Sequence, residues 1–292
     1  MREALKLKGI RMRNSKRERW PKVVVWSAAI LVSTVFFLIL SSIVWHGIGQ
    51  ISWEYITAAP KNAGRAGGIG PILVSTGLIL GVAIAVALPI GLGTAILLSE
   101  FTPRKSVFGS MVRRSLDILA GVPSIVFGLF GFVFFSNILG LGFSILSGGL
   151  TLACMVLPIL IRSTEEGFRS APEEYRISTA SVGLSKTTTI FRILLPAAAP
   201  GLTVGLILGV GRAIAETAAL LYTSGYVDRM PTSLLDSGRA LSIHIFDLSM
   251  NVAGGNEKAY ASALVLVSIL VVINIISFYI SNNWLRRRIT TI

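Results

Sequence analysis

Residues 162–223 read RSTEEGFRSAPEEYRISTASVGLSKTTTIFRILLPAAAPGLTVGLILGVGRAIAETAALLYT, and this stretch decides the fold. Its first half, 163–192, is rich in Arg, Glu, Ser and Thr and cannot lie in hydrocarbon. Its second half, 201–222, is apolar over the length of a bilayer, and its only charges are Arg212 and Glu216. A charge at the centre of a membrane-spanning helix costs about 2.5–3.5 kcal/mol on insertion scales, so it usually marks a functional pathway. The stretch therefore predicts a surface element joined to a membrane span that contains a charged pair.

The composition is that of an integral membrane protein. Of the 292 residues, 53% are hydrophobic and 14% are charged, whereas soluble domains carry about 25% charged residues. The net charge of +13 does not indicate nucleic acid, because the cations form blocks beside the apolar segments. We therefore expect an all-α membrane protein whose partners include the lipid bilayer and exclude nucleic acid.

Six membrane-spanning helices are expected, because a helix needs about 20 apolar residues to cross some 30 Å of hydrocarbon. Pro123, with Gly121 beside it, should bend or break the third of them. Residues 1–22 form a basic tail that precedes the first helix. The expected spans are 23–45, 72–98, 116–135, 150–161 with some residues beyond, 201–222 and 259–280.

The distribution of Lys and Arg sets the orientation. The positive-inside rule places Lys-rich and Arg-rich short segments in the cytoplasm. Both termini are therefore expected in the cytoplasm, in a multi-pass protein of the cell membrane. Four segments hold 21 of the 27 Lys and Arg residues: 1–22, 103–114, 162–192 and 286–288.

Two outer segments and two glycine spacings complete the expected architecture. The amphipathic run 234–248 is too interrupted to span and is expected to lie flat at the outer interface. The glycine-rich part of 46–71 is interpreted as a flexible connector. The GxxxG spacings Gly77–Gly81 and Gly205–Gly209 are interpreted as sites where helices approach closely.

The polar segment 163–199 is expected to form two short helices across the cytoplasmic mouth. Pro172 suits the start of the first helix, and Glu173 and Glu174 suit its first turn because of the helix dipole. Gly183 then gives a turn, and a second helix over 186–195 ends at Pro196. Such a pair of helices could dock in a groove of a partner; a solvated amphipathic loop is the alternative.

No constellation for catalysis or for a cofactor is present. The run Gly183-Leu184-Ser185-Lys186-Thr187 lacks the glycine before the lysine that a phosphate-binding loop requires. His46 and His244 have no spacing typical of a metal site. The chain is therefore not expected to be an enzyme, and ATP and Mg²⁺ should be bound by a partner.

The segment that contains Gly183 and, after nine intervening residues, Ile193-Leu194-Leu195-Pro196 resembles the EAA loop of ATP-binding-cassette importer permeases. The Glu-Ala-Ala triplet itself is replaced by Ile177-Ser178-Thr179. The resemblance implies a type I (MetI-like) permease core over 72–285, a sister permease, a dimer of ATPase subunits and an external binding protein. It also implies that the loop couples to the ATPase, through the residues Glu173, Glu174, Gly183, Ile193 and Pro196.

Three further stretches, 119–131, 162–166 and 211–218, resemble the permeases of phosphate-specific importers. This implies ATP-driven import of inorganic phosphate, with Arg212, Glu216 and Arg162 along the substrate pathway. Arg212 falls near the bilayer midplane, and a guanidinium can bind two phosphate oxygens at once. Glu216 follows at i+4, where it could pair with Arg212, so a purely structural ion pair is the alternative.

Other functions remain open from the residues alone. The same chemistry would suit another oxyanion, such as molybdate or sulfate, because each presents several acceptor oxygens. An independent secondary transporter or anion channel is a further alternative. A clear internal repeat and broken helices in both halves would be expected in that case.

Overall fold

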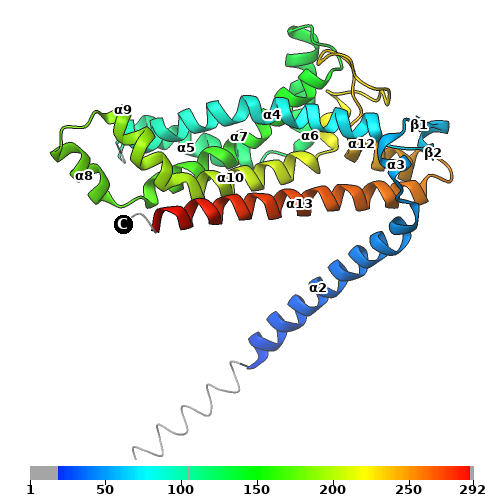
Figure 1. The fold of residues 1–292 in the computed structure, drawn as a ribbon, viewed down its shortest axis with the longest axis horizontal. Helices are drawn as coiled ribbons and strands as arrows, with labels where there is room; N and C mark the ends of the chain where they lie inside the picture. The colour runs from blue at the N-terminus through cyan, green and yellow to red at the C-terminus, as the bar shows by residue number, and fades with distance from the viewer. Residues whose placement is uncertain (1–18, 104, 290–292) are drawn as a thin grey trace, which may run out of the picture.

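The computed structural model describes residues 19–103 and 105–289, and side chains from 20 to 279 within those ranges. Long helices run side by side, with α8 and α9 at one end and α12, β1 and β2 at the other (Figure 1). We call these the α8 end and the α12 end. The helices are α2 (Arg19–Gly47), α3 (Trp53–Thr57), α4 (Gly70–Ile96), α5 (Val107–Ala120), α6 (Ser124–Gly131), α7 (Ile145–Ser170), α8 (Glu173–Ser181), α9 (Lys186–Thr189), α10 (Leu195–Ile214), α11 (Ala218–Leu221), α12 (Leu241–Met250) and α13 (Asn256–Ile289). The strands are β1 (Pro60–Lys61) and β2 (Ala66–Gly67), and π-helical turns cover Leu97–Phe101, Phe132–Ile138 and Ile190–Leu194.

Five helical segments in the described chain are long and apolar enough to cross a membrane. A sixth span results if α5 and α6, with the π-helical turn after α6, are counted as one broken span. The break predicted at Pro123 in the third span, 116–135, is confirmed, because the chain turns by 101° between α5 and α6. Pro123 causes the break, since it disfavours helical geometry at the residue before it and starts α6 afresh. α5 begins earlier than expected because the Ser106 hydroxyl accepts a hydrogen bond from the Gly109 amide.

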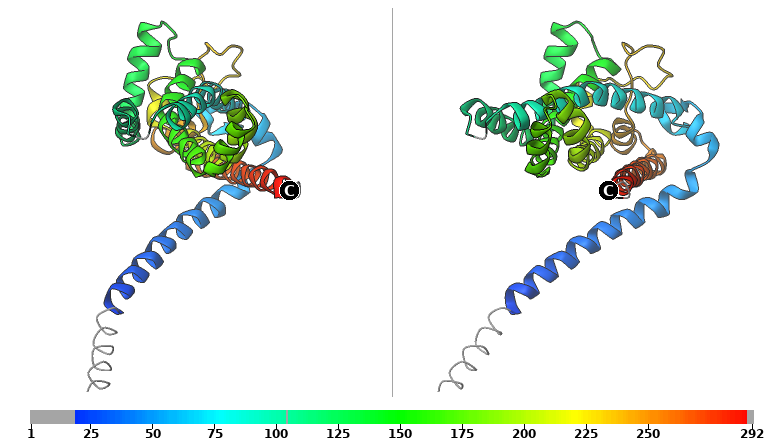
Figure 2. Two further views of the ribbon diagram at one scale, coloured as in Figure 1. Left: turned by 90° about the vertical axis from the view of Figure 1, so that its left-hand side faces the viewer. Right: turned by 60° about the vertical axis from the view of Figure 1, so that its left-hand side comes forward.

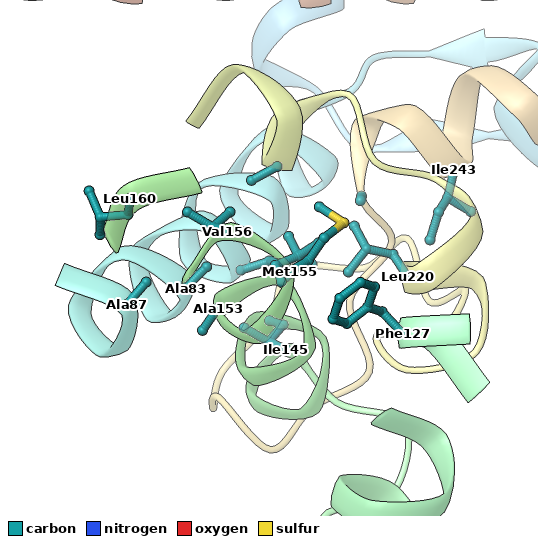
Figure 3. Close-up of a cluster of buried hydrophobic side chains, with 14 residues drawn as sticks. Ala83, Ala87, Phe127, Ile145, Ala153, Met155, Val156, Leu160, Leu220 and Ile243 are labelled. Carbon is teal, nitrogen blue, oxygen red and sulfur yellow. The ribbon is translucent and has the colours of Figure 1, made fainter. Parts of the chain in front are cut away.

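α7 is the central helix of the bundle. It packs against α4 on one side and α10 on the other, and two thirds of its most apolar window is buried. It extends beyond the predicted 150–161, as was expected without a fixed limit, because Ser144 caps its start and its polar last turns remain helical. Residues 163–170, expected in the polar loop, therefore belong to α7. Figure 3 shows the core that these helices share, which includes Ala83, Ala87, Met155, Val156 and Leu160.

Glycines allow α7 and α10 to cross with their backbones in contact. A Cβ atom on Gly201 would lie 2.5 Å from the Ser163 carbonyl oxygen and 2.6 Å from the Gly167 Cα. Gly205 and Gly209 of α10 also face α7, so the packing interpretation of this GxxxG spacing is confirmed. The same interpretation is wrong for the Gly77–Gly81 spacing of α4, because no other part of the described chain approaches these two glycines.

α10 forms one continuous helix with the segment before it and ends early. The second short helix, predicted over 186–195, does not end at Pro196; the helix continues from Lys186 to Ile214. Pro196 lies inside this continuous helix, directly after the π-helical turn Ile190–Leu194, and it has no backbone N–H to donate. The predicted span 201–222 is also too long, because residues 215–217 leave the helix before the short α11.

In the run 234–248, which was predicted to lie flat at the outer interface, only the residues from Leu241 onward are helical, as α12. Its side chains Leu241, Ile243 and Leu248 are buried among α4, α13 and their neighbours. The preceding residues are not helical; the carbonyl oxygens of Leu234 and Asp236 accept hydrogen bonds from the first amides of α7. The run therefore caps the α12 end of the bundle. The glycine-rich connector also has defined structure, as the β1–β2 hairpin follows α3 there.

α2 leaves the bundle at an angle (Figure 2). It touches α13 near the α12 end, where Gly47 approaches the Tyr260 carbonyl and His46 stacks on the Tyr260 ring at 5.0 Å. None of its most apolar window is buried within the chain. Most of the basic tail, residues 1–18, lies outside the described residues.

His244 of α12 gives the fold a pH dependence. Its ring is 1% exposed and lies against the turn at Gly64. Burial, and to a smaller extent Arg239, lowers the pKa of His244 from 6.5 to about 4, against the opposing influence of Asp247 and Asp228. The unfolded chain therefore takes up a proton at this residue between about pH 6.5 and 4 that the folded chain does not, so stability falls as the pH falls through that window.

We expect the melting temperature of the purified protein to fall from pH 7.5 to pH 4.5, and to fall less in His244→Gln. The variant should avoid a loss in the free energy of unfolding on the order of 3 kcal/mol, because each unit by which the pKa of His244 is lowered corresponds to about 1.4 kcal/mol. His46→Gln is the matched control, because that ring is exposed. Parallel melting curves for His244→Gln and the wild type would show that His244 does not carry the effect.

Candidate functional site

Arg212 lies on an outward-facing stripe of α10. It follows Leu208 by four residues and Val204 by eight, which are 54% and 50% exposed, so the three side chains share one face. Arg212 itself is half-buried, and its guanidinium makes no ion pair or hydrogen bond with any described residue. An unpaired cation facing hydrocarbon is costly. The Arg212 guanidinium is therefore suited to contact a polar path or an anion, although Val204 and Leu208 on the same face are apolar.

The pairing of Arg212 with Glu216, predicted from their i, i+4 spacing, is wrong. The helix ends at Ile214, so Glu216 does not lie one turn further along it. Its carboxylate instead accepts a hydrogen bond of 3.1 Å from the Ala219 amide in α11, and its carbonyl accepts one of 2.5 Å from Ser242. Glu216 thus holds the broken segment against α12 and leaves the Arg212 charge uncompensated by the described chain.

Arg162 is remote from Arg212. Gly209 faces Val156 of the antiparallel α7, so Arg212 lies level with residues near Ala153, roughly 14 Å along the axis from Arg162. Arg162 is 40% exposed and is held by Asp117 of α5 through contacts of 2.5 and 3.0 Å. The two arginines predicted for one pathway therefore stand at different depths.

A buried carboxylate at the α8 end was missed by the sequence analysis. Glu165 is 3% exposed, and three arginines surround it: Arg113 at 2.7 Å, Arg169 at 2.8 Å and Arg162 at 3.7 Å. The only signal for these ion pairs in the sequence was spacing: Arg162 precedes Glu165 by three residues and Arg169 follows it by four, so all three share one face of α7. Arg113 comes from α5, and no local pattern connects it with Glu165.

The loop predicted to couple to a partner was 163–199; since 163–170 belong to α7, we call residues 171–196 the coupling segment. Glu173 and Glu174 lie in the first turn of α8, and both are exposed. Gly183 has φ +76°, which glycine adopts without strain, and it ends α8 by the bonds Gly183 N–Ala180 O and Leu184 N–Thr179 O. Ile193 lies half-buried in a π-helical turn, and Pro196 follows it.

The coupling segment presents apolar side chains at a polar end of the molecule. Their exposed fractions range from 42% to 78%, although charged residues separate them from the apolar body of the bundle. Exposed apolar groups in such a place are typical of a protein–protein contact. They are Ile177, Val182, Leu184 and Phe191.

A cavity of about 790 Å³ opens beside the coupling segment, at the π-helical turn after α4. Charged groups of both signs line it, so it is unsuited to an apolar ligand. Lys186 lies 5.4 Å from the centre of the Phe101 ring at this cavity. The other charged lining residues are Glu100, Arg169, Glu173 and Arg176.

The chain is similar to known transport permeases in sequence. It is 29% identical over 273 residues to the probable ABC transporter permease protein YqgI of Bacillus subtilis, covering 88% of this chain and 90% of that one. It is 32% identical over 268 residues to the phosphate transport system permease protein PstA 1 of Mycobacterium tuberculosis (strain CDC 1551 / Oshkosh), covering 90% and 84%.

Solved structures show the same fold. A chain of a bacterial ABC transporter involved in the import of the acidic polysaccharide alginate matches with a TM-score of 0.57 at 16% identity, covering 89% of this chain and 95% of that one. The inward-facing MetNI methionine ABC transporter matches with a TM-score of 0.55 at 18% identity, covering 74% and 94%. The predicted all-α importer-permease architecture is confirmed. Residues 87–291 match the model of the binding-protein-dependent transport system inner membrane components, and the chain belongs to that family.

Proposed function

We propose that this chain is a membrane-spanning subunit of an ATP-driven importer of inorganic phosphate. The observation that carries the proposal is the unpaired guanidinium of Arg212 on the outward stripe of α10. A transported phosphate can accept two hydrogen bonds from the Arg212 guanidinium as it passes. Since the phosphate must also leave, a single site that binds it weakly suits transport. The phosphate transport permeases among the relatives support the choice of anion.

The assembly that we propose follows from the two ends of the bundle. A sister permease covers the stripe that carries Arg212, so that the path runs between the two subunits. A dimer of ATPase subunits, which binds ATP and Mg²⁺, docks on the coupling segment at the α8 end. An external phosphate-binding protein docks at the α12 end. Both termini then lie in the cytoplasm, and Arg162 stands near the inner exit of the path.

The experiment that tests the proposal is phosphate uptake by vesicles that contain the whole complex. The chain is co-expressed with a sister permease and an ATPase subunit, purified through a tag on this chain, and reconstituted with loaded binding protein outside and ATP inside. We expect ATP-dependent phosphate uptake that excess sulfate or molybdate does not compete away. Competition by either would favour the other oxyanion, and uptake by this chain alone would favour an independent transporter.

Gly183→Val should weaken coupling in that complex. A β-branched residue at φ +76° costs roughly 1–2 kcal/mol, so the turn between α8 and α9 would shift. We expect ATP hydrolysis stimulated by the loaded binding protein to fall about tenfold, the equivalent of 1.4 kcal/mol. Gly183→Asn is the control, because asparagine tolerates this conformation. Full stimulation in an assembled Gly183→Val complex would contradict the role of this turn.

A further inference from the structure

Arg176 fastens the coupling segment to the end of α4. Its guanidinium donates two hydrogen bonds to Glu100, at 2.7 Å to Oε1 and 3.1 Å to Oε2, in the two-pronged geometry of the strongest arginine–carboxylate pairs. The same side chain reaches the carbonyls of Phe168 and Ala171 at 2.9 and 3.3 Å, where α7 passes into α8. Both partners are well shielded, with 22% and 10% of their side chains exposed. The pair is therefore more than a surface ion pair.

The same turn of α4 is held from its other side by α5. Arg113 donates to the Leu98 carbonyl at 2.9 Å and to Glu165 at 2.7 Å, so it joins the π-helical turn to α7. The turn Leu97–Phe101 thus lies between two arginines that come from different helices. π-helical turns are frequent at functional sites, where they replace the regular helical hydrogen bonds.

The far end of α4 touches the segment beside Arg212. The Thr76 hydroxyl accepts a hydrogen bond of 2.9 Å from the Leu241 amide at the start of α12. The next residue, Ser242, donates to the Glu216 carbonyl in the break after α10. One continuous helix therefore contacts the coupling segment at one end and, through α12, the break beside Arg212 at the other.

We propose that Arg176 and Glu100 are positioning residues that make α4 the link between the coupling segment and the break beside Arg212. The inference rests on the proposed function and adds to it the route by which the docked ATPase acts on the path. Displacement of α8 by the ATPase pulls on Glu100, α4 carries the displacement to Thr76, and α12 moves the segment that holds Glu216. Neither residue touches phosphate; both act through α4.

The test compares Glu100→Gln and Arg176→Gln with their double variant in the reconstituted complex. Basal ATP hydrolysis, stimulation by loaded binding protein, and phosphate imported per ATP are measured. Each single variant should lower stimulation and the import ratio about tenfold, equivalent to 1.4 kcal/mol. Basal hydrolysis should stay unchanged in Glu100→Gln, because Glu100 lies outside the coupling segment. The double variant should be no worse than either single one, because the two residues act as one unit. Glu166→Gln and Arg114→Gln are the matched controls, since both residues are exposed and make no ion pair with a described residue.

Two outcomes would overturn the proposal. One is unchanged stimulation and import ratio in an assembled Glu100→Gln complex; the other is a double variant whose loss is the product of the single losses. If Glu100→Gln fails to assemble, Glu100→Asp keeps the charge while shortening the side chain, and a lowered import ratio is expected from it. A wild-type complex that responds to a binding protein loaded with another oxyanion would refute the phosphate assignment, and the comparison of variants would still decide on α4.

Discussion

Arg212→Gln should strongly lower phosphate uptake by the reconstituted complex and leave its assembly intact. The guanidinium has no counter-ion in the described chain, so its removal leaves no buried carboxylate unpaired. What is lost is a charged donor to the passing anion, worth about 1.5–3 kcal/mol, or roughly 10- to 150-fold in uptake rate. Uptake of radiolabelled phosphate, normalised to the amount of assembled complex, measures the effect.

Two companion variants separate the pathway role from a structural one. Arg212→Lys keeps the positive charge but loses the two-pronged donor geometry of the guanidinium, so uptake should be impaired less than in Arg212→Gln. Glu216→Gln should retain most uptake, because an amide oxygen can still accept the hydrogen bond from Ala219. Normal uptake by an assembled Arg212→Gln complex would end the pathway hypothesis.

Gly201→Val should prevent folding of the bundle. The added side chain would meet the Ser163 carbonyl and the Gly167 Cα, and backbone atoms of a helix cannot move aside as a flexible side chain can. α7 and α10 would have to separate along their whole contact, so we expect the variant to be lost from the folded fraction. The measurement is the monodisperse yield after detergent extraction, read from a fluorescent fusion on size-exclusion chromatography.

Gly93→Val is the matched control for that prediction. Gly93 also lies in a long apolar helix, α4, and a Cβ atom there would have nothing within 4 Å. Its yield should stay near that of the wild type. Equal yields of the two variants would show that α7 and α10 tolerate a wider crossing than their glycines indicate.

The sequence predicts the long elements of this fold well and their ends poorly. Hydropathy located the five long apolar helices α2, α4, α7, α10 and α13, because exclusion from water depends on composition over about 20 residues. Pro123 indicated a break, but the size of the turn, 101°, could not be predicted, because it depends on the contacts of α5, in which Arg113 binds Glu165 of α7. The polar turns of α7 were taken for a loop because the ion pairs around Glu165 involve a residue 52 positions away.

The site was only partly predictable, for a related reason. Arg212 stood out because a charge inside an apolar span is costly wherever it points. Its pairing with Glu216 assumed a continuous helix, and nothing in the run Ala213-Ile214-Ala215-Glu216-Thr217 is a strong helix breaker. Where the helix ends, Glu216 accepts hydrogen bonds from Ala219 and Ser242. Ser242 follows Glu216 by 26 positions, so no local pattern could reveal this contact. Spacing rules describe a helix once it exists and do not tell where it ends.

The exposure of α2 bears on how this chain can diverge. Its most apolar window buries nothing within the chain, whereas two thirds of the corresponding window of α7 is buried. Selection on such a lipid-facing helix acts on hydropathy and length, so apolar residues there can exchange freely over evolutionary time. In α7 the shape of each side chain is constrained by α4 and α10. The family model covers residues 87–291, so α2 lies outside the part of the chain that it describes.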